Sequence, residues 1–379
     1  MVSRQSTAVR VVSATCAALA LSVSAPAVAA TDNASVKVGD VQKAMEALVK
    51  TGHVVGAIGE VYVDGKRVAK GSAGSRLLNG EGGKIPSTAR YRIGSQTKQM
   101  TATVVMQLVQ RGKLKLDDKL SKVLPEVAEK DLVERADEIT VRNLIQHTSG
   151  VPESFSPDID ALDTTVTYRA IDLVAASRTQ QRPSEIGTFN YSNTNYILLG
   201  MIVEKLTGHP LATELKRKIF TPLGMRDTYL PVKGSEGIKG PHGHGYMVNE
   251  KGAVVDVDKL NATAMLGAGG VISTAHDMSA FLRAFNQGKL LPASLSKVIT
   301  ERPGMPPLPG GGPCAGNPEF GPRNDGSAPG FISTTFASSD GRLQFAVSMT
   351  LAMDDDERLT AGRPLGDALT SVFCPASAS

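Results

Sequence analysis

Alternating hydrophobic and polar positions predict a β-hairpin near each end of the chain. Residues 54–70, VVGAIGEVYVDGKRVAK, alternate around Asp64 and Gly65, and residues 330–351 repeat the pattern around a second Asp-Gly pair. An Asp-Gly pair between two alternating runs favours a tight turn between antiparallel strands. Between the hairpins, hydrophobic positions recur at helical spacing in several segments, namely 96–113, 169–178, 193–206, 210–219 and 276–288.

This order of elements predicts a mixed α/β fold. We expect an antiparallel sheet formed by the N- and C-terminal strands and flanked by helices, because each hairpin has an apolar face to bury. A mostly helical lobe, roughly residues 120–260, is expected as an insertion in the α/β part. Residues 31–379 are expected to form one domain.

Residues 1–30 have the pattern of a secretory signal peptide. Arg4 and Arg10 precede the apolar run VVSATCAALALSVSA, and small residues follow in APAVAA. The alternative is an uncleaved membrane anchor. No other segment approaches the roughly 18 apolar residues of a membrane span, so we expect a secreted mature chain that has no span.

Charge and cysteine content narrow the picture further. The formal net charge of +4 falls to +2 when Arg4 and Arg10 leave with the signal peptide, which is too small to favour nucleic acid or a membrane surface. Cys314 and Cys374 remain in the mature chain. An even number of cysteines in an oxidising compartment predicts that they pair, and the alternative is two buried free thiols.

A Ser-x-x-Lys motif, Ser95 to Lys98, opens the segment IGSQTKQMTATVVMQLV. Ser95 alone is equally consistent with a helix N-cap. The apolar residues after Lys98 predict a buried helix, however, and burial lowers the pKa of a lysine. A neutral amine one turn from a hydroxyl can activate a serine nucleophile. A second copy of the motif, Ser294 to Lys297, is interpreted as a surface helix turn.

Two further segments carry candidate chemistry. FNYSNTNYILLG contains Tyr191, whose phenol can relay a proton, and Asn193, whose amide can hold both a lysine and a substrate carbonyl. The alternative for Asn193 is a helix cap, which the segment alone favours. RNDGSAPGFIST, residues 323–334, leads into a strand whose edge can donate a backbone N–H to an oxyanion.

Together these segments resemble the serine β-lactamase and DD-peptidase superfamily, specifically its class C β-lactamase-like branch. That branch also contains D-alanyl-D-alanine carboxypeptidases, D-aminopeptidases and esterases. The resemblance covers most of residues 40–352. It is carried by several stretches in order: YRIGSQTKQMTA, GKLKLDDKLSKVLPEV, ITVRNLIQHTSGVP, GTFNYSNTNYILLGMIVEKLTG, TPLGMRDTYL and GAGGVISTAHDMSAFL.

The resemblance implies a role for each candidate residue. Ser95 is the implied acylated nucleophile, Lys98 its base partner and Tyr191 the proton relay to the leaving group. Asn193 is the implied polar support, and the N–H groups of Ser95 and Ser327 the oxyanion hole. The implied substrate is a small peptide, ester or β-lactam, with peptidoglycan as a partner, and no cofactor is implied.

The third motif departs from the family pattern. The branch usually has His-x-Gly or Lys-x-Gly where this chain has Asn324, Asp325 and Gly326. Asn324 supplies no positive charge, and an inward-pointing Asp325 would repel a substrate carboxylate. We therefore expect intact acyl-enzyme machinery but weaker recognition of a free C-terminal carboxylate. The alternatives are an esterase or D-aminopeptidase on the same scaffold, and a non-catalytic wall-binding protein.

Three other motifs have structural interpretations. His147, in HTSG, is expected to be structural rather than catalytic. His242 and His244 form a His-x-His pair in a glycine-rich loop, and two histidines alone are more often not ligands, so we expect no metal. GAGG at 267–270 has neither a preceding strand nor the full spacing of a dinucleotide site.

Overall fold

The computed structural model describes residues 38–50, 53–154, 162–248, 252–304, 324–353 and 362–373. These residues belong to a compact unit that begins at Lys37. The predicted signal peptide, residues 1–30, lies outside the described residues, and so do Cys314 and Cys374. The signal peptide and the disulfide therefore stay predictions.

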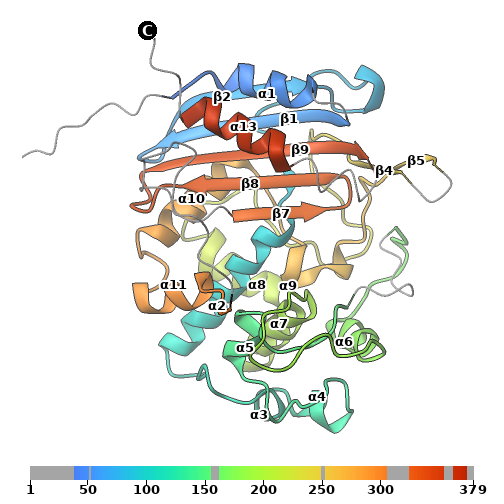
Figure 1. The fold of residues 1–379 in the computed structure, drawn as a ribbon, viewed down its shortest axis with the longest axis vertical. Coiled ribbons are helices and arrows are strands. Elements are labelled where there is room, and N and C mark those ends of the chain that lie inside the picture. The colour runs from blue at the N-terminus through green and yellow to red at the C-terminus, as the bar shows by residue number, and fades with distance from the viewer. Residues whose placement is uncertain are drawn as a thin grey trace, which may run out of the picture. The chain divides into compact units, whose positions relative to one another are not determined.

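A sheet joins strands from the two ends of the chain (Figure 1). Its main strands are β1 (Val54–Val63), β2 (Lys66–Gly74), β7 (Asn324–Ala328), β8 (Phe331–Ala337) and β9 (Leu343–Met353). β1 pairs antiparallel with β2 and β9, and β8 pairs antiparallel with β9 and β7. The predicted antiparallel sheet of N- and C-terminal strands is thus confirmed.

The first hairpin turns where the sequence predicts it. Asp64 (φ 51°) and Gly65 (φ 79°) both have left-handed backbone conformations between β1 and β2. A two-residue turn with two positive φ angles matches the right-handed twist of the strands that it joins. The second predicted hairpin is β8 and β9, with Gly341 (φ 68°) in the turn between them.

Helices cover both faces of the sheet. The helices of the described ranges are α1 (Val41–Lys50), α2 (Thr97–Gln110), α3 (Leu120–Val123), α4 (Pro125–Glu129), α5 (Val141–Ile145), α6 (Ala170–Arg178), α7 (Thr194–Thr207), α8 (Leu211–Leu215), α9 (Leu266–Gly269), α10 (Ala275–Asn286), α11 (Ala293–Thr300) and α13 (Gly362–Phe373). The predicted helical segments correspond to α2, α6, α7, α8 and α10. None of these helices combines the length and hydrophobicity that a membrane crossing requires.

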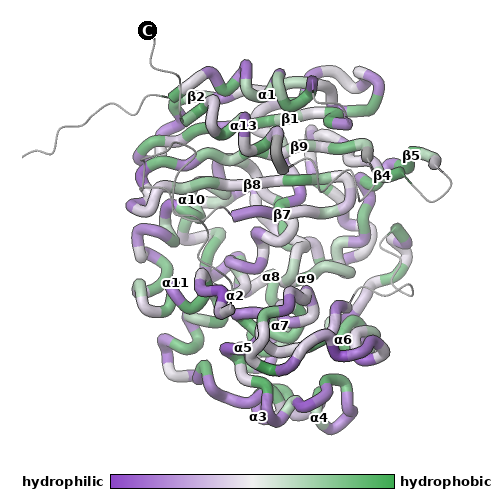
Figure 2. The backbone as a smooth tube through the Cα atoms, in the orientation of Figure 1, coloured by the Kyte–Doolittle hydropathy of each residue, from purple (hydrophilic) through white to green (hydrophobic). Residues whose placement is uncertain are grey.

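Alternate residues of β9 separate two hydrophobic cores. Phe345 and Val347 pack with α1 and α13, whereas Ala346, between them, faces the core that contains α10 and α2. Successive side chains of a strand point to opposite faces, so the sheet lies between these two layers. Figure 2 shows hydrophobic residues along β1 and β9, and the buried residues of α1 are Val41, Ala44, Met45 and Leu48.

The regular secondary structure of the inserted segment is helical except near its end. It contains α3 to α8, but residues expected in the helical lobe also form β4 (Tyr246–Val248) and β5 (Val254–Asp256). β4 pairs parallel with β9 through Tyr246 and Ala352, so this part of the chain returns to the sheet. A further two-stranded sheet, β3 (Tyr91–Arg92) with β6 (Ile272–Ser273), lies just before the Ser95 turn.

Candidate active site

Ser95 lies in a tight turn that leads into α2. The turn is a single 3-10 element, Gly94–Gln96, and Gln96 rather than Ser95 is the N-cap residue of α2. Gly94 has φ 52°, and a Cβ there would lie 2.4 Å from the backbone oxygen of Ser327. The turn therefore needs glycine for its conformation and for the close approach of β7, and Ser95 is not the simple N-cap that its motif alone allowed.

Lys98 follows one turn later on α2 and is buried, with 6% of its surface exposed. Its Nζ donates to Asn193 Oδ1 at 2.6 Å, to the Ala268 carbonyl at 2.7 Å and to Ser95 Oγ at 3.2 Å. Burial lowers the pKa of Lys98 to about 7, although the negative charge of Glu153 acts in the opposite direction. A substantial fraction of Lys98 is therefore neutral near pH 7.

The three acceptors around Lys98 decide where its lone pair points. Asn193 Oδ1 and the Ala268 carbonyl only accept hydrogen bonds, so each needs an N–H from the amine. A neutral amine then has no third N–H for Ser95 Oγ, and its lone pair faces that hydroxyl at 3.2 Å. Loss of one proton converts Lys98 from a donor to Ser95 into an acceptor from it.

Tyr191 approaches Ser95 from the segment before α7. Its Oη lies 2.7 Å from Ser95 Oγ, and its ring stacks on His147 with ring centroids 4.4 Å apart. Desolvation of its hydroxyl raises the pKa of Tyr191 to about 12, which its hydrogen bond to Ser95 only partly offsets. Tyr191 is therefore protonated at neutral pH and is suited to give a proton rather than to take the first one.

His147 supports the tyrosine, in agreement with its structural interpretation. Burial lowers the pKa of His147 to about 3, and the nearby positive charge of Lys98 acts in the same direction. The ring is therefore neutral, and its Nδ1 accepts a hydrogen bond from the Ser192 backbone N–H at 3.2 Å. A neutral ring held in this way fixes the plane on which Tyr191 stacks.

Glu153 is a site residue that the sequence did not reveal. Its Oε2 accepts hydrogen bonds from both the backbone N–H and the side-chain Nδ2 of Asn193, each at 3.0 Å. These bonds fix the orientation of the Asn193 amide and turn Oδ1 toward Lys98. Glu153 directly follows the HTSGVP stretch, and a single acid in a loop has no spacing that marks it.

The third motif lies beside the Ser95 turn. A Cβ at Gly326 would lie 1.8 Å from the Ile93 carbonyl, so this residue must be glycine at the observed separation. Asn324 faces the same side and donates from Nδ2 to Gln99 Oε1 on α2 at 2.7 Å. Strand alternation places Asp325 and Ser327 on the opposite face.

Asp325 does not point inward. Its side chain is exposed, and its Oδ1 accepts a hydrogen bond from Thr334 Oγ1 of β8 at 2.6 Å. The repulsion expected from an inward-pointing Asp325 therefore has no structural basis. β7 pairs with β8 among the described strands, and its other edge runs along the Ser95 turn, with a Cβ of Gly94 lying 2.6 Å from the Ser327 backbone nitrogen.

Two more groups near the site were not predicted. The Ala268 carbonyl that Lys98 contacts belongs to the GAGG stretch, which forms α9 and packs on α2. Arg302 is exposed, and its positive charge lowers the pKa of both Tyr191 and His147. For Tyr191 this opposes the larger effect of desolvation, and for His147 it adds to that effect. Arg302 thus adds positive charge in the neighbourhood of Tyr191 and His147, from a segment that carries no motif.

Comparisons with known proteins find relatives of this chain in both sequence and fold. The family model described as Beta-lactamase matches residues 41–363. The chain is 36% identical over 189 residues to penicillin-binding protein 4 of Amycolatopsis lactamdurans, which is 49% of this chain and 48% of that protein. It is 30% identical over 247 residues to an N-acetylmuramyl-L-alanine amidase of Bacillus subtilis (strain 168), covering 60% of this chain and 53% of that protein. The chain spans about half the length of these curated relatives.

Two solved structures share the fold over nearly their whole length. A D-stereospecific amidohydrolase from Streptomyces sp. is 28% identical, with a TM-score of 0.71 over 89% of this chain and 98% of that chain. A D-amino acid amidase from Ochrobactrum anthropi SV3 is 23% identical, with a TM-score of 0.72 over 87% and 97%. Because its identity is only 23%, the second structure is evidence for a shared fold alone. From its sequence match and its fold, this chain belongs to the Beta-lactamase family, within the superfamily of serine β-lactamases and DD-peptidases.

Proposed function

We propose that this protein is a serine amidohydrolase that acts through an acyl-enzyme on Ser95. The observation that carries the proposal is the position of Ser95 Oγ, 2.7 Å from Tyr191 Oη and 3.2 Å from Lys98 Nζ. A hydroxyl between a neutral amine and a protonated phenol has both a proton acceptor and a proton donor within reach.

In the proposed reaction, Ser95 Oγ attacks the substrate carbonyl carbon while its proton passes to neutral Lys98. In this proposal the oxyanion accepts hydrogen bonds from the backbone N–H groups of Ser95 and Ser327, because β7 lies against the Ser95 turn. Tyr191 gives its proton to the departing amine, and the C–N bond breaks. The phenolate regains a proton from Lys98, and water then hydrolyses the ester bond on Ser95.

For substrates, we propose amide bonds of D-amino-acid-containing peptides, with D-alanyl-D-alanine carboxypeptidase activity as the leading case and β-lactams as acylating analogues. The names of the relatives, which include a penicillin-binding protein and a D-stereospecific amidohydrolase, support this class. Arg302 offers a cation for a terminal carboxylate, and Asp325 lies on the other face of β7. Peptidoglycan is the corresponding macromolecular partner.

The alternative, an esterase or D-aminopeptidase on the same scaffold, rests on Asn324. The family usually has His or Lys at this position, whereas the amide of Asn324 is neutral and donates a hydrogen bond to Gln99. β7 therefore brings no positive charge to the site at this position. A substrate without a terminal carboxylate would lose nothing from this change. D-Alaninamide and a p-nitrophenyl ester therefore belong beside a D-Ala-D-Ala peptide in any substrate test.

We also propose that the protein is secreted after removal of residues 1–30, and that Cys314 pairs with Cys374. The N-terminal sequence of the secreted protein tests the first, and an N-terminus at Met1 would contradict it. Thiol titration of the unreduced, denatured protein tests the second, and two reactive thiols would contradict the pairing.

The function is tested by covalent labelling with a fluorescent penicillin, together with turnover of diacetyl-Lys-D-Ala-D-Ala, D-alaninamide and a p-nitrophenyl ester. Ser95→Ala is expected to abolish labelling and turnover. The matched control is Ser294→Ala in the second Ser-x-x-Lys motif, whose Ser294 and Lys297 are both exposed on α11. This control should behave like the wild type.

Each outcome separates the alternatives. D-Ala release lost in Ser95→Ala would establish the carboxypeptidase, and Arg302→Ala should then raise KM for the peptide more than for the amide. Amide or ester turnover without D-Ala release would favour the alternative enzymes. Labelling that survives in Ser95→Ala would overturn Ser95 as nucleophile, and a folded protein with neither labelling nor turnover would favour the non-catalytic wall-binding reading.

A further inference from the structure

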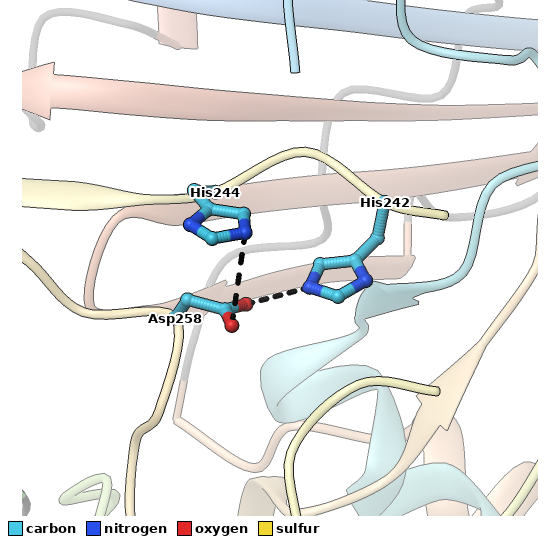
Figure 3. A group of neighbouring side chains, drawn as sticks. All are labelled: His242, His244 and Asp258. Carbon is cyan, nitrogen blue, oxygen red and sulfur yellow. Dashed lines mark hydrogen bonds and ion pairs between the residues drawn. The ribbon is translucent and has the colours of Figure 1, made fainter. Parts of the chain in front are cut away.

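Two histidines and an aspartate meet at the base of the β4–β5 hairpin. His242 and His244 lie just before β4, and Asp258 follows β5. One nitrogen of each imidazole and a carboxylate oxygen all lie within 4.8 Å of one another. Figure 3 shows both rings directed at the same carboxylate. The His-x-His pair alone does not predict a metal, but the fold adds a third donor from another segment.

The hydrogen bonds of His242 fix which of its nitrogens carries a proton. Nδ1 lies 2.5 Å from the Gly240 carbonyl, which can only accept, so Nδ1 is the N–H donor. Nε2 lies 2.8 Å from Asp258 Oδ1. In the neutral ring, the Nε2 lone pair would therefore face a carboxylate oxygen. Two acceptors at this separation need a cation between them.

His244 repeats this arrangement. Its Nδ1 lies 2.8 Å from Asp256 Oδ2 and donates to that carboxylate, while its Nε2 lies 3.8 Å from Asp258 Oδ2. The two rings are nearly parallel, with centroids 5.3 Å apart and an interplanar angle of 11°. Metal-binding histidines usually donate their second N–H to a carbonyl or carboxylate, as both rings do here.

Charge around the cluster also favours a cation. Asp256 and Asp258 bring two negative charges, and the side chain of Asp258 is only 14% exposed. Buried Arg92 donates from Nη2 to the backbone oxygen of Asp258 at 2.6 Å, so it leaves both carboxylate oxygens to the imidazoles. With both imidazoles neutral, the two carboxylates outweigh the single positive charge of Arg92 and leave the cluster with a net negative charge.

We propose that His242, His244 and Asp258 bind a divalent transition-metal ion, with zinc as the best fit, and that Asp256 and the Gly240 carbonyl orient the two imidazoles. Imidazole and carboxylate are ordinary zinc ligands, with bonds of about 2.0–2.2 Å. Two tetrahedral ligands of one zinc ion then lie roughly 3.4 Å apart. The contacts of 2.8 and 3.8 Å fall on either side of this separation, and the two imidazole nitrogens lie within 4.8 Å of each other, so side-chain rotation has to bring the three donors onto one ion.

The ion would join the segment before β4 to the segment after β5 and so close the base of the hairpin. Through the bond from Arg92 to Asp258, the same base is tied to β3, which ends three residues before Ser95. Three protein ligands leave one position for water. The site uses none of the groups that contact Ser95, so it stands or falls independently of the proposed hydrolase.

The test uses untagged full-length protein that has been stripped of metal with a chelator. Titration with ZnCl2 is followed by calorimetry, and titration with Co2+ by visible absorption, which reports the ligand field. We expect one ion per chain and a rise in melting temperature with zinc. The double variant His242→Ala/His244→Ala should lose both the bound ion and the rise in melting temperature. Asp256→Asn should weaken zinc binding about 10- to 100-fold.

The control is His276→Ala, because His276 contacts Asp277 at 2.9 Å but is exposed. It should bind zinc like the wild type. His244→Gln and Asp258→Asn repeat the test with smaller changes if the double variant does not fold. The absence of saturable zinc and cobalt binding would overturn the proposal and leave a protonated imidazole pair as the cation. Equal binding by the folded ligand variants would overturn it as well.

Discussion

Glu153 binds Asn193 through two hydrogen bonds to one carboxylate oxygen, each 3.0 Å long. This pair turns Asn193 Oδ1 toward Lys98 Nζ, 2.6 Å away, and sets a negative charge close to the lysine. Burial and Glu153 thus act on Lys98 in opposite directions. The balance between them holds the pKa of Lys98 at about 7, where the amine can both take and return a proton.

Glu153→Gln is therefore expected to change the pH dependence of catalysis. The wild-type kcat/KM should rise with pH through about 7, since Lys98 must be neutral to accept the Ser95 proton. Removing the negative charge lowers the pKa of Lys98 further, so this rising limb should move to lower pH. Weaker positioning of Asn193 should reduce the plateau value about 10-fold, the equivalent of one lost charge-assisted hydrogen bond.

The pH profile of kcat/KM measures both effects. Glu126→Gln is the control, because Glu126 contacts Lys205 at 3.4 Å elsewhere on the helical lobe. It should leave the limb in place. A limb that stays where it is in Glu153→Gln, or moves to higher pH, would contradict the role given to this carboxylate.

Burial of Lys98 also predicts how stability depends on pH. The unfolded lysine has a pKa of about 10.4, and the folded one about 7. Between these values the unfolded chain binds a proton that the folded chain does not, so the free energy of unfolding contributed by Lys98 increases with pH. This contribution of Lys98 to stability is fully present above the pKa of the unfolded lysine and is lost as the pH falls toward 7.

Lys98→Met should remove this contribution, because the variant has no group to titrate there. The measurement is urea unfolding at several pH values from neutral to alkaline, compared with the wild type and with Lys297→Met. Lys297 is exposed on α11, and its removal should leave the slope unchanged. Equal slopes in the wild type and Lys98→Met would show that Lys98 has a normal pKa.

Gly326→Ala tests the close packing of β7 on the Ser95 turn. The added Cβ would lie 1.8 Å from the Ile93 carbonyl, so the strand has to move away from the nucleophile. We expect a loss of roughly 1–3 kcal/mol in the free energy of unfolding, as for other overpacked sites, together with slower acylation. Thermal unfolding and the labelling rate give the two values.

Gly237→Ala is the matched control for that substitution. No atom lies within 4 Å of a Cβ built there, so stability and labelling should stay close to wild type. Gly326→Ala with wild-type stability and labelling would mean that β7 does not pack against the turn as closely as the Gly326–Ile93 separation requires.

The sheet and the principal helices could be predicted because their signals are local. Asp64 and Gly65 fix the first hairpin, and nearly uncharged stretches rich in apolar residues mark α2 and α7 as buried helices. β4 and β5 were missed because strands of three residues carry almost no periodic pattern. Their place in the sheet depends on pairing with β9, more than a hundred residues away in sequence.

The same difference between local and tertiary signals decides which site residues could be predicted. Ser95, Lys98, Tyr191 and Asn193 stand in motifs with short spacings, and the structure brings them together. Glu153, the Ala268 carbonyl and Arg302 belong to no spacing pattern, because each reaches the site through the tertiary fold. Asp258 is a similar case, since only the β4–β5 hairpin brings it to His242 and His244.

Tyr191→Phe separates the two proton transfers of the proposed reaction. The variant keeps the ring that stacks on His147 and loses the hydroxyl 2.7 Å from Ser95 Oγ. Lys98 would still activate the serine, but the departing amine would lose its proton donor. An amide must be protonated to leave, whereas p-nitrophenolate leaves without a proton. We therefore expect kcat/KM to fall about 10²- to 10⁴-fold for an amide and far less for a p-nitrophenyl ester.

The comparison is made on one preparation, with acylation rates for both substrates and a thermal melt to check folding. Tyr229→Phe is the control, because the Tyr229 hydroxyl bonds to the Gly237 carbonyl and the Lys239 N–H rather than to the site. An equal loss on both substrates would assign Tyr191 to activation of Ser95 instead. In that case the raised pKa of Tyr191, about 12, would have to fall when substrate binds.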